Sequence, residues 1–214
     1  MHAWVLAEEV VKELVSLNVK LYAMELAKVL VLAEQNVNKN KYSYCLFSSI
    51  TEETVKPLIA FLQDIEDKSI LDLYINSQGG LVLVAIGIFN FIKSIKGLKI
   101  NTYNIGHCDS AATLLFFLGN KRYATKNSSF FMHSLQVSLS KPQTINSLQA
   151  EINNLKADKE AFVNLLAKNS RITKKQWNSY MSDKGSLIKA KKALEIGIID
   201  AIYEEQNFEL IKRR

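Results

Sequence analysis

Short strand-like segments alternate with segments of helical period along most of this sequence, and that alternation restricts the fold more than any other feature. Apolar runs too short for helices are bounded by turn residues at 44–47, 70–75 and 99–104. Each is followed by a segment of helical period, at residues 54–66, 81–95 and 111–118. Because a helix between two strands returns the chain in a right-handed crossover, we expect an α/β fold with a mainly parallel sheet.

The same pattern continues in the second half of the chain. We expect further strands at residues 122–124, 130–132 and 198–203 and helices at 144–168 and 188–196. Only 2 Pro and 8 Gly interrupt 214 residues, and 48% of the residues are hydrophobic, enough to form a core. Thr54 is expected to cap the first of these helices, with Pro57 tolerated in its first turn. The pattern predicts one α/β domain over residues 39–214.

Residues 1–38 are expected to form a separate helical extension. Their apolar residues, among them Val11, Leu14 and Val15, follow a wide helical stripe that should pack on a surface. Charged residues between Glu8 and Lys28 leave no uncharged window of the 18–20 residues that a membrane-spanning helix needs, about 30 Å of hydrocarbon. The extension also lacks the basic start and the cleavage site of a secretory signal. We therefore expect a cytoplasmic protein without a membrane segment.

Charge and metal-ligand content argue against several classes of function. The 27 basic and 21 acidic residues give a net charge of +6, but only four of the basic residues are Arg, so we expect no nucleic-acid binding. Two Cys and three His are too few for the usual zinc motifs, and no glycine motif for nucleotides occurs. We expect neither a metal nor a cofactor, and two Cys suit a reducing compartment.

Two junctions between a strand and a helix carry the candidate chemistry. Gly79-Gly80 has bare backbone N–H groups that can bind an oxyanion, although a plain turn also explains this pair. Ser110 precedes an apolar helix, as a nucleophile on a sharp turn does, although serine is also a common N-cap. His133 follows the strand at 130–132, where a general base can lie, although a histidine without a role is the alternative.

Three stretches of the sequence together indicate a family. They are YINSQGGLVLVAIGIFNFIK, GHCDSAATLLFFLGNKRYATKNSSFFMHS and LEIGIID. In this order they resemble the proteolytic subunits of Clp protease, serine peptidases of the ClpP/crotonase fold, over about residues 42–204. The resemblance implies ClpP/crotonase-like repeated units, with the helix at 144–168 as the handle between rings. It also implies a homo-oligomeric ring, a heptamer or double heptamer, and a ring-shaped AAA+ ATPase as partner.

The resemblance further implies a serine endopeptidase acting on unfolded proteins or peptides. By position, the nucleophile, the general base and the two oxyanion-hole amides fall on Ser110, His133, Gly80 and Ala111. For the third member of the triad, an ungapped count reaches Met181, which cannot orient a histidine. A shift of two residues brings Asp183 to that place, and Asp183 is therefore the candidate.

Departures from the family pattern leave other hypotheses open. Asp109 replaces a small apolar residue before the nucleophile, Gln78 replaces a proline, and the helical extension has no counterpart. A catalytically silent homologue that serves as an assembly or regulatory subunit is the second hypothesis. A signal-peptide-peptidase-like enzyme with a Ser–Lys pair and a crotonase-like enzyme are further alternatives. A peptidase that uses Cys108 has no support from the family.

Overall fold

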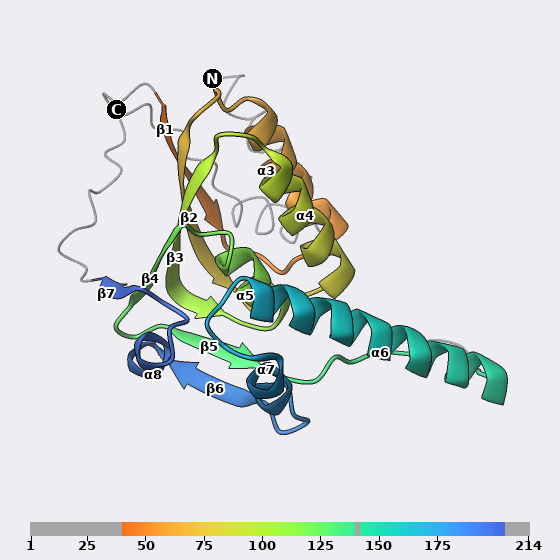
Figure 1. Cartoon of the computed structure of the whole chain (residues 1–214). Coiled ribbons are helices and arrows are strands. Elements are labelled where there is room, and N and C mark those ends of the chain that lie inside the picture. The colour runs from red at the N-terminus through yellow and green to blue at the C-terminus, as the bar shows by residue number, and fades with distance from the viewer. Residues whose placement is uncertain (1–39, 140–141, 204–214) are drawn as a thin grey trace, which may run out of the picture.

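A mainly parallel sheet forms the centre of the computed structural model, which describes residues 40–139 and 142–203 (Figure 1). Its parallel strands lie in the order β1 (Lys41–Leu46), β2 (Ile70–Ser77), β3 (Lys99–Cys108), β4 (Lys121–Thr125) and β7 (Ala201–Tyr203). Strand β5 (Ser129–Met132) pairs with the end of β3 and runs antiparallel to β6 (Ser186–Lys189). The predicted α/β class is confirmed, while the predicted helix at 1–38 lies outside the described residues.

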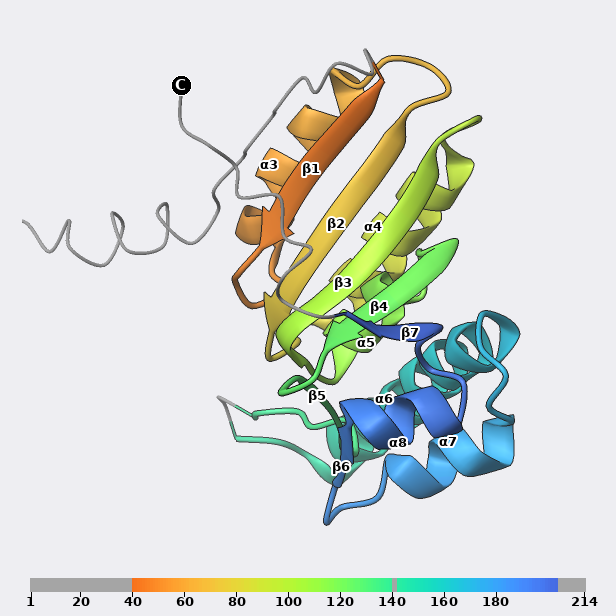
Figure 2. The same ribbon diagram turned by 90° about the vertical axis from the view of Figure 1, so that its left-hand side faces the viewer.

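The helices fall into two groups. Helices α3 (Glu52–Gln63), α4 (Val82–Ser94) and α5 (Ala111–Phe116) cover one face of the parallel sheet, as Figures 1 and 2 show. Helices α6 (Ile145–Lys168), α7 (Lys174–Tyr180) and α8 (Ala190–Glu195) gather at the end of the molecule where β5 and β6 pair. The core between the layers is apolar because α3 and α4 each turn a stripe inward, with Leu58 and Ile88 buried.

Two predicted helix starts are wrong. Helix α3 is capped by Thr51 rather than Thr54: the Thr51 hydroxyl accepts from the Thr54 N–H at 3.3 Å, and the Thr54 hydroxyl accepts from the Thr51 N–H at 2.9 Å. Pro57 therefore lies inside the helix, beyond its first turn. The helix predicted from residue 188 begins only at Ala190, because the preceding residues pair with β5.

Strand β3 is longer than predicted, and this moves the functional turn. The strand continues through Gly106 to Cys108, which pairs with Ser77 of β2 after a register shift. The side-chain oxygen of Asn76 accepts from the His107 N–H at 3.0 Å and fastens this added part. The chain therefore turns into α5 at Asp109 and Ser110, rather than directly after residue 104.

Helix α6 confirms the predicted long helix. The hydroxyl of Thr144 accepts from the Ser147 N–H at 3.1 Å and caps its first turn. The C-terminal half packs on the body, with Phe162 and Leu166 fully buried. The N-terminal half projects away from the body (Figure 1), and its apolar side chains stay exposed. These are Ile145, Leu148 and Ile152, at 85%, 39% and 47%.

Candidate active site

Ser110 lies on a strained turn between β3 and α5. Its backbone has φ 49° and ψ −123°, a conformation that residues with a Cβ rarely adopt and that costs about 1–3 kcal/mol. Although Ser110 holds the N-cap position of α5, its side chain makes no capping hydrogen bond. Its N–H donates to the Phe131 carbonyl at 2.7 Å, which ties the turn to β5. An ordinary capping role therefore does not account for this serine.

Gly79 and Gly80 allow a second turn to approach Ser110 closely. Gly79 has φ +91°, and a Cβ there would lie 2.6 Å from the Asp109 carbonyl oxygen and 2.9 Å from the Ser110 Cβ. Gly80 has φ +149°, and a Cβ there would overlap the carbonyl oxygen of Ile50. Both positions therefore require glycine, for their left-handed backbone and for the space around them.

The N–H groups of Gly80 and Ala111 are available to bind an anion. Ile50 donates to the Gly79 carbonyl at 2.8 Å and accepts from the Leu81 N–H at 2.9 Å, so the N–H of Gly80 points away from Ile50. Ala111 is the first residue of α5, where an N–H has no partner within the helix. Within residues 40–139 and 142–203, neither group donates a hydrogen bond.

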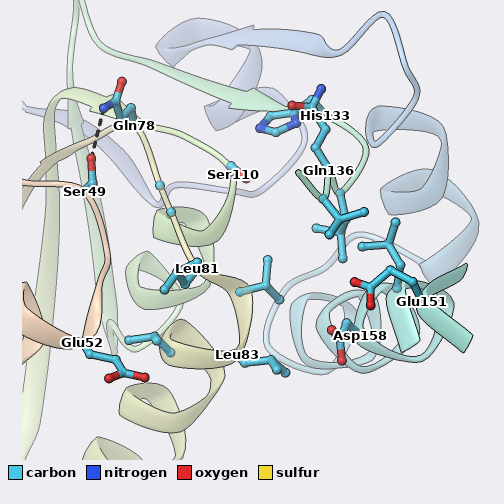
Figure 3. Close-up of a pocket in the computed structure, with 17 residues that line it drawn as sticks. Ser49, Glu52, Gln78, Leu81, Leu83, Ser110, His133, Gln136, Glu151 and Asp158 are labelled. Atoms are coloured by element: carbon cyan, nitrogen blue, oxygen red, sulfur yellow. Dashed lines mark hydrogen bonds between the residues drawn. The ribbon is translucent and has the colours of Figure 1, made fainter. Parts of the chain in front are cut away.

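His133 follows β5 directly and lies in the same pocket as Ser110 (Figure 3). Its ring stacks on that of Phe131, with ring centroids 5.8 Å apart and planes 27° apart. Its Nδ1 lies 2.7 Å from the carbonyl oxygen of Ser134. Because a carbonyl can only accept, Nδ1 carries the proton, and Nε2 keeps the lone pair that a general base needs.

Asp183 lies next to the base without contacting its ring. The hydroxyl of Ser134 donates to Asp183 Oδ1 at 2.8 Å, and no hydrogen bond joins Asp183 to His133 in the described part of the chain. Met181, the ungapped alternative, is 1% exposed, so its side chain belongs to the core. The structure thus brings Ser110, His133 and Gly80 to one pocket. Ala111 follows Ser110 and is buried, and Asp183 is hydrogen-bonded to Ser134, the residue after the base.

Asp109 precedes Ser110 but is not among the residues that line the pocket. Its Oδ2 is 3.6 Å from His107 Nδ1, and its Oδ1 is buried with no partner among the described residues. Burial raises the pKa of this carboxyl, whereas a hydrogen bond from the Phe131 backbone and the charges of His107 and His133 oppose the rise. Asp109 is therefore a poorly solvated acid that lies close to both histidines.

The pocket has a volume of about 650 Å³, and both apolar and polar side chains line it. Its walls come from the start of α4, from the segment after His133 and from α6, with acidic groups at Glu52, Glu151 and Asp158 (Figure 3). The apolar lining consists of Leu81, Val82, Leu83, Val84, Leu135, Val137 and Leu155. These walls were not predicted from the sequence. Leu135 and Val137 alternate with polar residues, as in extended chain, and this pattern could have indicated one wall.

Other kinds of site find little support in the described residues. They contain no group of three or more His, Cys, Asp or Glu side chains arranged to hold a metal ion. None of their helices combines the length and the apolar character that crossing a membrane requires. Cys45 and Cys108 are both free, and Cys108 is fully buried. Burial and the nearby Asp109 raise the pKa of the Cys108 thiol well above its usual value, which makes Cys108 a poor nucleophile.

Comparison with known proteins covers every residue of this site. A family model described as Clp protease matches residues 40–206. Curated relatives include the ATP-dependent Clp protease proteolytic subunits of Dehalococcoides mccartyi strains BAV1 and CBDB1. Each is 26% identical to this chain over 165 residues, which cover 75% of this chain and 80% of the relative. The residues matched by the family model span both strand–helix turns, the candidate base and Asp183.

Proposed function

Because the chain belongs to the Clp protease family, we propose that it is a serine endopeptidase that hydrolyses peptide bonds in unfolded proteins or peptides. One observation carries the proposal: Ser110 sits on a strained turn where its hydroxyl caps no helix, in the pocket that also holds His133. Strain of this kind is characteristic of nucleophiles at strand–helix turns.

The reaction follows from the positions of these groups. Ser110 Oγ attacks the scissile carbonyl carbon while His133 Nε2 takes its proton. The N–H groups of Gly80 and Ala111 stabilise the oxyanion of the tetrahedral intermediate, since neither has another partner among the described residues. The imidazolium then gives its proton to the leaving amine. Water attacks the resulting acyl-enzyme ester, with His133 again as base, and Asp183 is the third member of the triad.

Assembly and partners extend the proposal. We propose that residues 39–214 form the peptidase domain, that residues 1–38 form the helical extension, and that the domain assembles into a heptameric or double-heptameric ring. The projecting half of α6 supports assembly because its exposed apolar residues lack cover from the described part of the chain. The sequence contains no phosphate-binding glycine motif, so a separate AAA+ ATPase would supply unfolding in the cytoplasm.

A catalytically silent subunit is the second candidate, and two observations favour it. The carboxyl group of Asp183 contacts Ser134 rather than the imidazole, and the residue that precedes the nucleophile in the sequence, Asp109, is a buried acid instead of a small apolar residue. A Ser–Lys enzyme finds less support, because no lysine lines the pocket among the described residues.

Labelling with a fluorophosphonate tests the proposal, since this reagent reacts only with an activated serine. The full-length protein, purified by size exclusion, is treated and digested, and the adduct is located by mass spectrometry. We expect the adduct on Ser110, its loss in the Ser110→Ala and His133→Ala variants, and its retention in Ser49→Ala. Ser49 is the matched control because it lines the same pocket. An unlabelled Ser110 in the assembled protein would favour the silent subunit.

A further inference from the structure

Ser134 contacts both the proposed base and the proposed third member of the triad. Its carbonyl oxygen is 2.7 Å from His133 Nδ1, and its hydroxyl is 2.8 Å from Asp183 Oδ1. The same hydroxyl is 2.9 Å from the Met181 carbonyl oxygen, and the Ser134 N–H donates to the Ser182 carbonyl at 3.3 Å. Ser134 therefore fastens the loop at residues 181–183 to the end of β5.

The hydroxyl of Ser134 has two acceptors within reach but only one hydrogen to donate. When it donates to Asp183, it holds the carboxyl group; when it turns to Met181, it releases that group. Asp183 is exposed, so water replaces the bond that the carboxyl group loses. The two arrangements therefore differ by the exchange of one hydrogen bond, and rotation about a single side-chain bond of Ser134 interconverts them.

The imidazole has a similar choice between acceptors. Its Nδ1–H donates to the neutral carbonyl of Ser134, which fixes the tautomer but supplies no charge to stabilise the imidazolium. A carboxylate makes a hydrogen bond about twice as strong. The loop that carries Asp183 runs beside the ring system of the base: a Cβ at Gly185 would contact the Phe131 ring, on which His133 stacks. A released Asp183 therefore starts close to the imidazole.

We propose that Ser134 is a positioning residue that holds Asp183 away from His133, and that the triad closes when the Ser134 hydroxyl turns to Met181. The inference rests on the proposed function, because it concerns the same base. We call the hydrogen bond from the Ser134 hydroxyl to Asp183 Oδ1 the latch. With the latch made, the Ser134 carbonyl orients the base alone; with the latch open, the Asp183 carboxylate replaces that carbonyl.

The test is a double-mutant cycle on the full-length protein with Ser134→Ala, Asp183→Asn and both together, and with Ser134→Thr, which keeps the hydroxyl, as the control. The measured quantity is the rate of Ser110 labelling by a fluorophosphonate from pH 5 to 9. We expect Ser134→Ala to raise the alkaline plateau about threefold or more, because its triad is always closed. Its acid limb should move to higher pH, since contact with a carboxylate favours the imidazolium. Asp109, which also acts on His133, is present in every variant and does not affect the comparison.

The carboxylate should matter only when the latch is absent. We expect Asp183→Asn to change the plateau less than about twofold in the natural sequence. In the Ser134→Ala protein it should cancel the whole gain of about threefold or more, because the Ser134 backbone carbonyl then orients the base again. Ser134→Thr should behave like the natural sequence. A slower Ser134→Ala protein with an unmoved acid limb, or equal effects of Asp183→Asn in both backgrounds, would overturn the inference while leaving the peptidase intact. An unlabelled Ser110 in every variant would instead overturn the proposed function, and this inference with it.

Discussion

Replacing Gly79 by alanine should disable the Ser110 turn, whereas the same change at Gly87 should not. A Cβ at Gly79 would lie 2.6 Å from the Asp109 carbonyl oxygen, 2.9 Å from the Ser110 Cβ and 3.0 Å from the Ala111 nitrogen. None of these atoms is the flexible end of a side chain, so relief requires the backbone of the turn to move. Gly87 lies on the exposed side of α4, and a Cβ there meets nothing within 4 Å.

The size of the effect follows from these contacts. An ordinary contact needs about 3.4 Å, so the Asp109 carbonyl must move by about 0.8 Å, and a shift of about 1 Å at a catalytic group costs about 100-fold in rate. For stability, the left-handed backbone costs about 1–2 kcal/mol and the overpacking about 1–3 kcal/mol. We therefore expect Gly79→Ala to lose about 2–5 kcal/mol. Gly87→Ala should gain up to about 1 kcal/mol, because alanine favours the helix.

Two measurements on the same preparations test this reasoning. Urea unfolding gives the free energy difference between each variant and the natural sequence, at one protein concentration because assembly would shift the midpoint. Fluorophosphonate labelling gives the rate at Ser110 under conditions where the variant remains folded. A Gly79→Ala protein that stays within about 0.5 kcal/mol of the natural stability and labels at the natural rate would refute the claim that Gly79 fixes the turn.

Three further predictions concern single groups. Burial raises the pKa of Asp109 above its unfolded value of about 3.9, so ionisation of this carboxyl opposes folding. Asp109→Asn should therefore be more stable than the natural sequence at pH 7. In urea unfolding, this gain in stability should shrink as the pH falls to about 4. Burial raises the pKa of the Cys45 thiol, and Cys108 is fully buried. Iodoacetamide at pH 8 should therefore alkylate Cys45 slowly and Cys108 only in denaturant. Rapid labelling of Cys108 in the native protein, detected by mass spectrometry, would contradict the described core. Thr51→Ala should cost about 1 kcal/mol in urea unfolding and Thr51→Ser much less, whereas equal stabilities of the two would argue against Thr51 as the cap of α3.

The sequence was sufficient to predict how the candidate site is brought together. The carboxyl ends of β2, β3 and β5 lead into the turn at Gly80, the turn at Ser110 and the side chain of His133. Parallel strands end at the same edge of a sheet, so residues that follow them meet there without knowledge of any distance. The long helix α6 could also be predicted from the sequence, because its helical period is uninterrupted from the cap to the last turn.

The features that the sequence did not predict have different physical causes. Thr51 and Thr54 are both good caps, and the choice depends on the bond from the Thr54 hydroxyl to the Ser49 carbonyl at 2.6 Å. Helix α7 was missed because it is short and mostly polar, with Trp177 as its buried residue. The partner of Asp183 is a hydroxyl 49 positions away in the sequence, and no local pattern specifies such a pair.

One face of helix α6 belongs both to the pocket and to the projecting half. Leu155 lines the pocket, and Ile152, Leu148 and Ile145 continue the same stripe outward at helical spacing. A helix of 24 residues is about 36 Å long and moves as a stiff unit, so a displacement of its projecting end also displaces the pocket wall at Leu155. Thermodynamic linkage makes this reciprocal: if covering the free end tightens a peptide in the pocket by some factor, the peptide tightens the cover by the same factor.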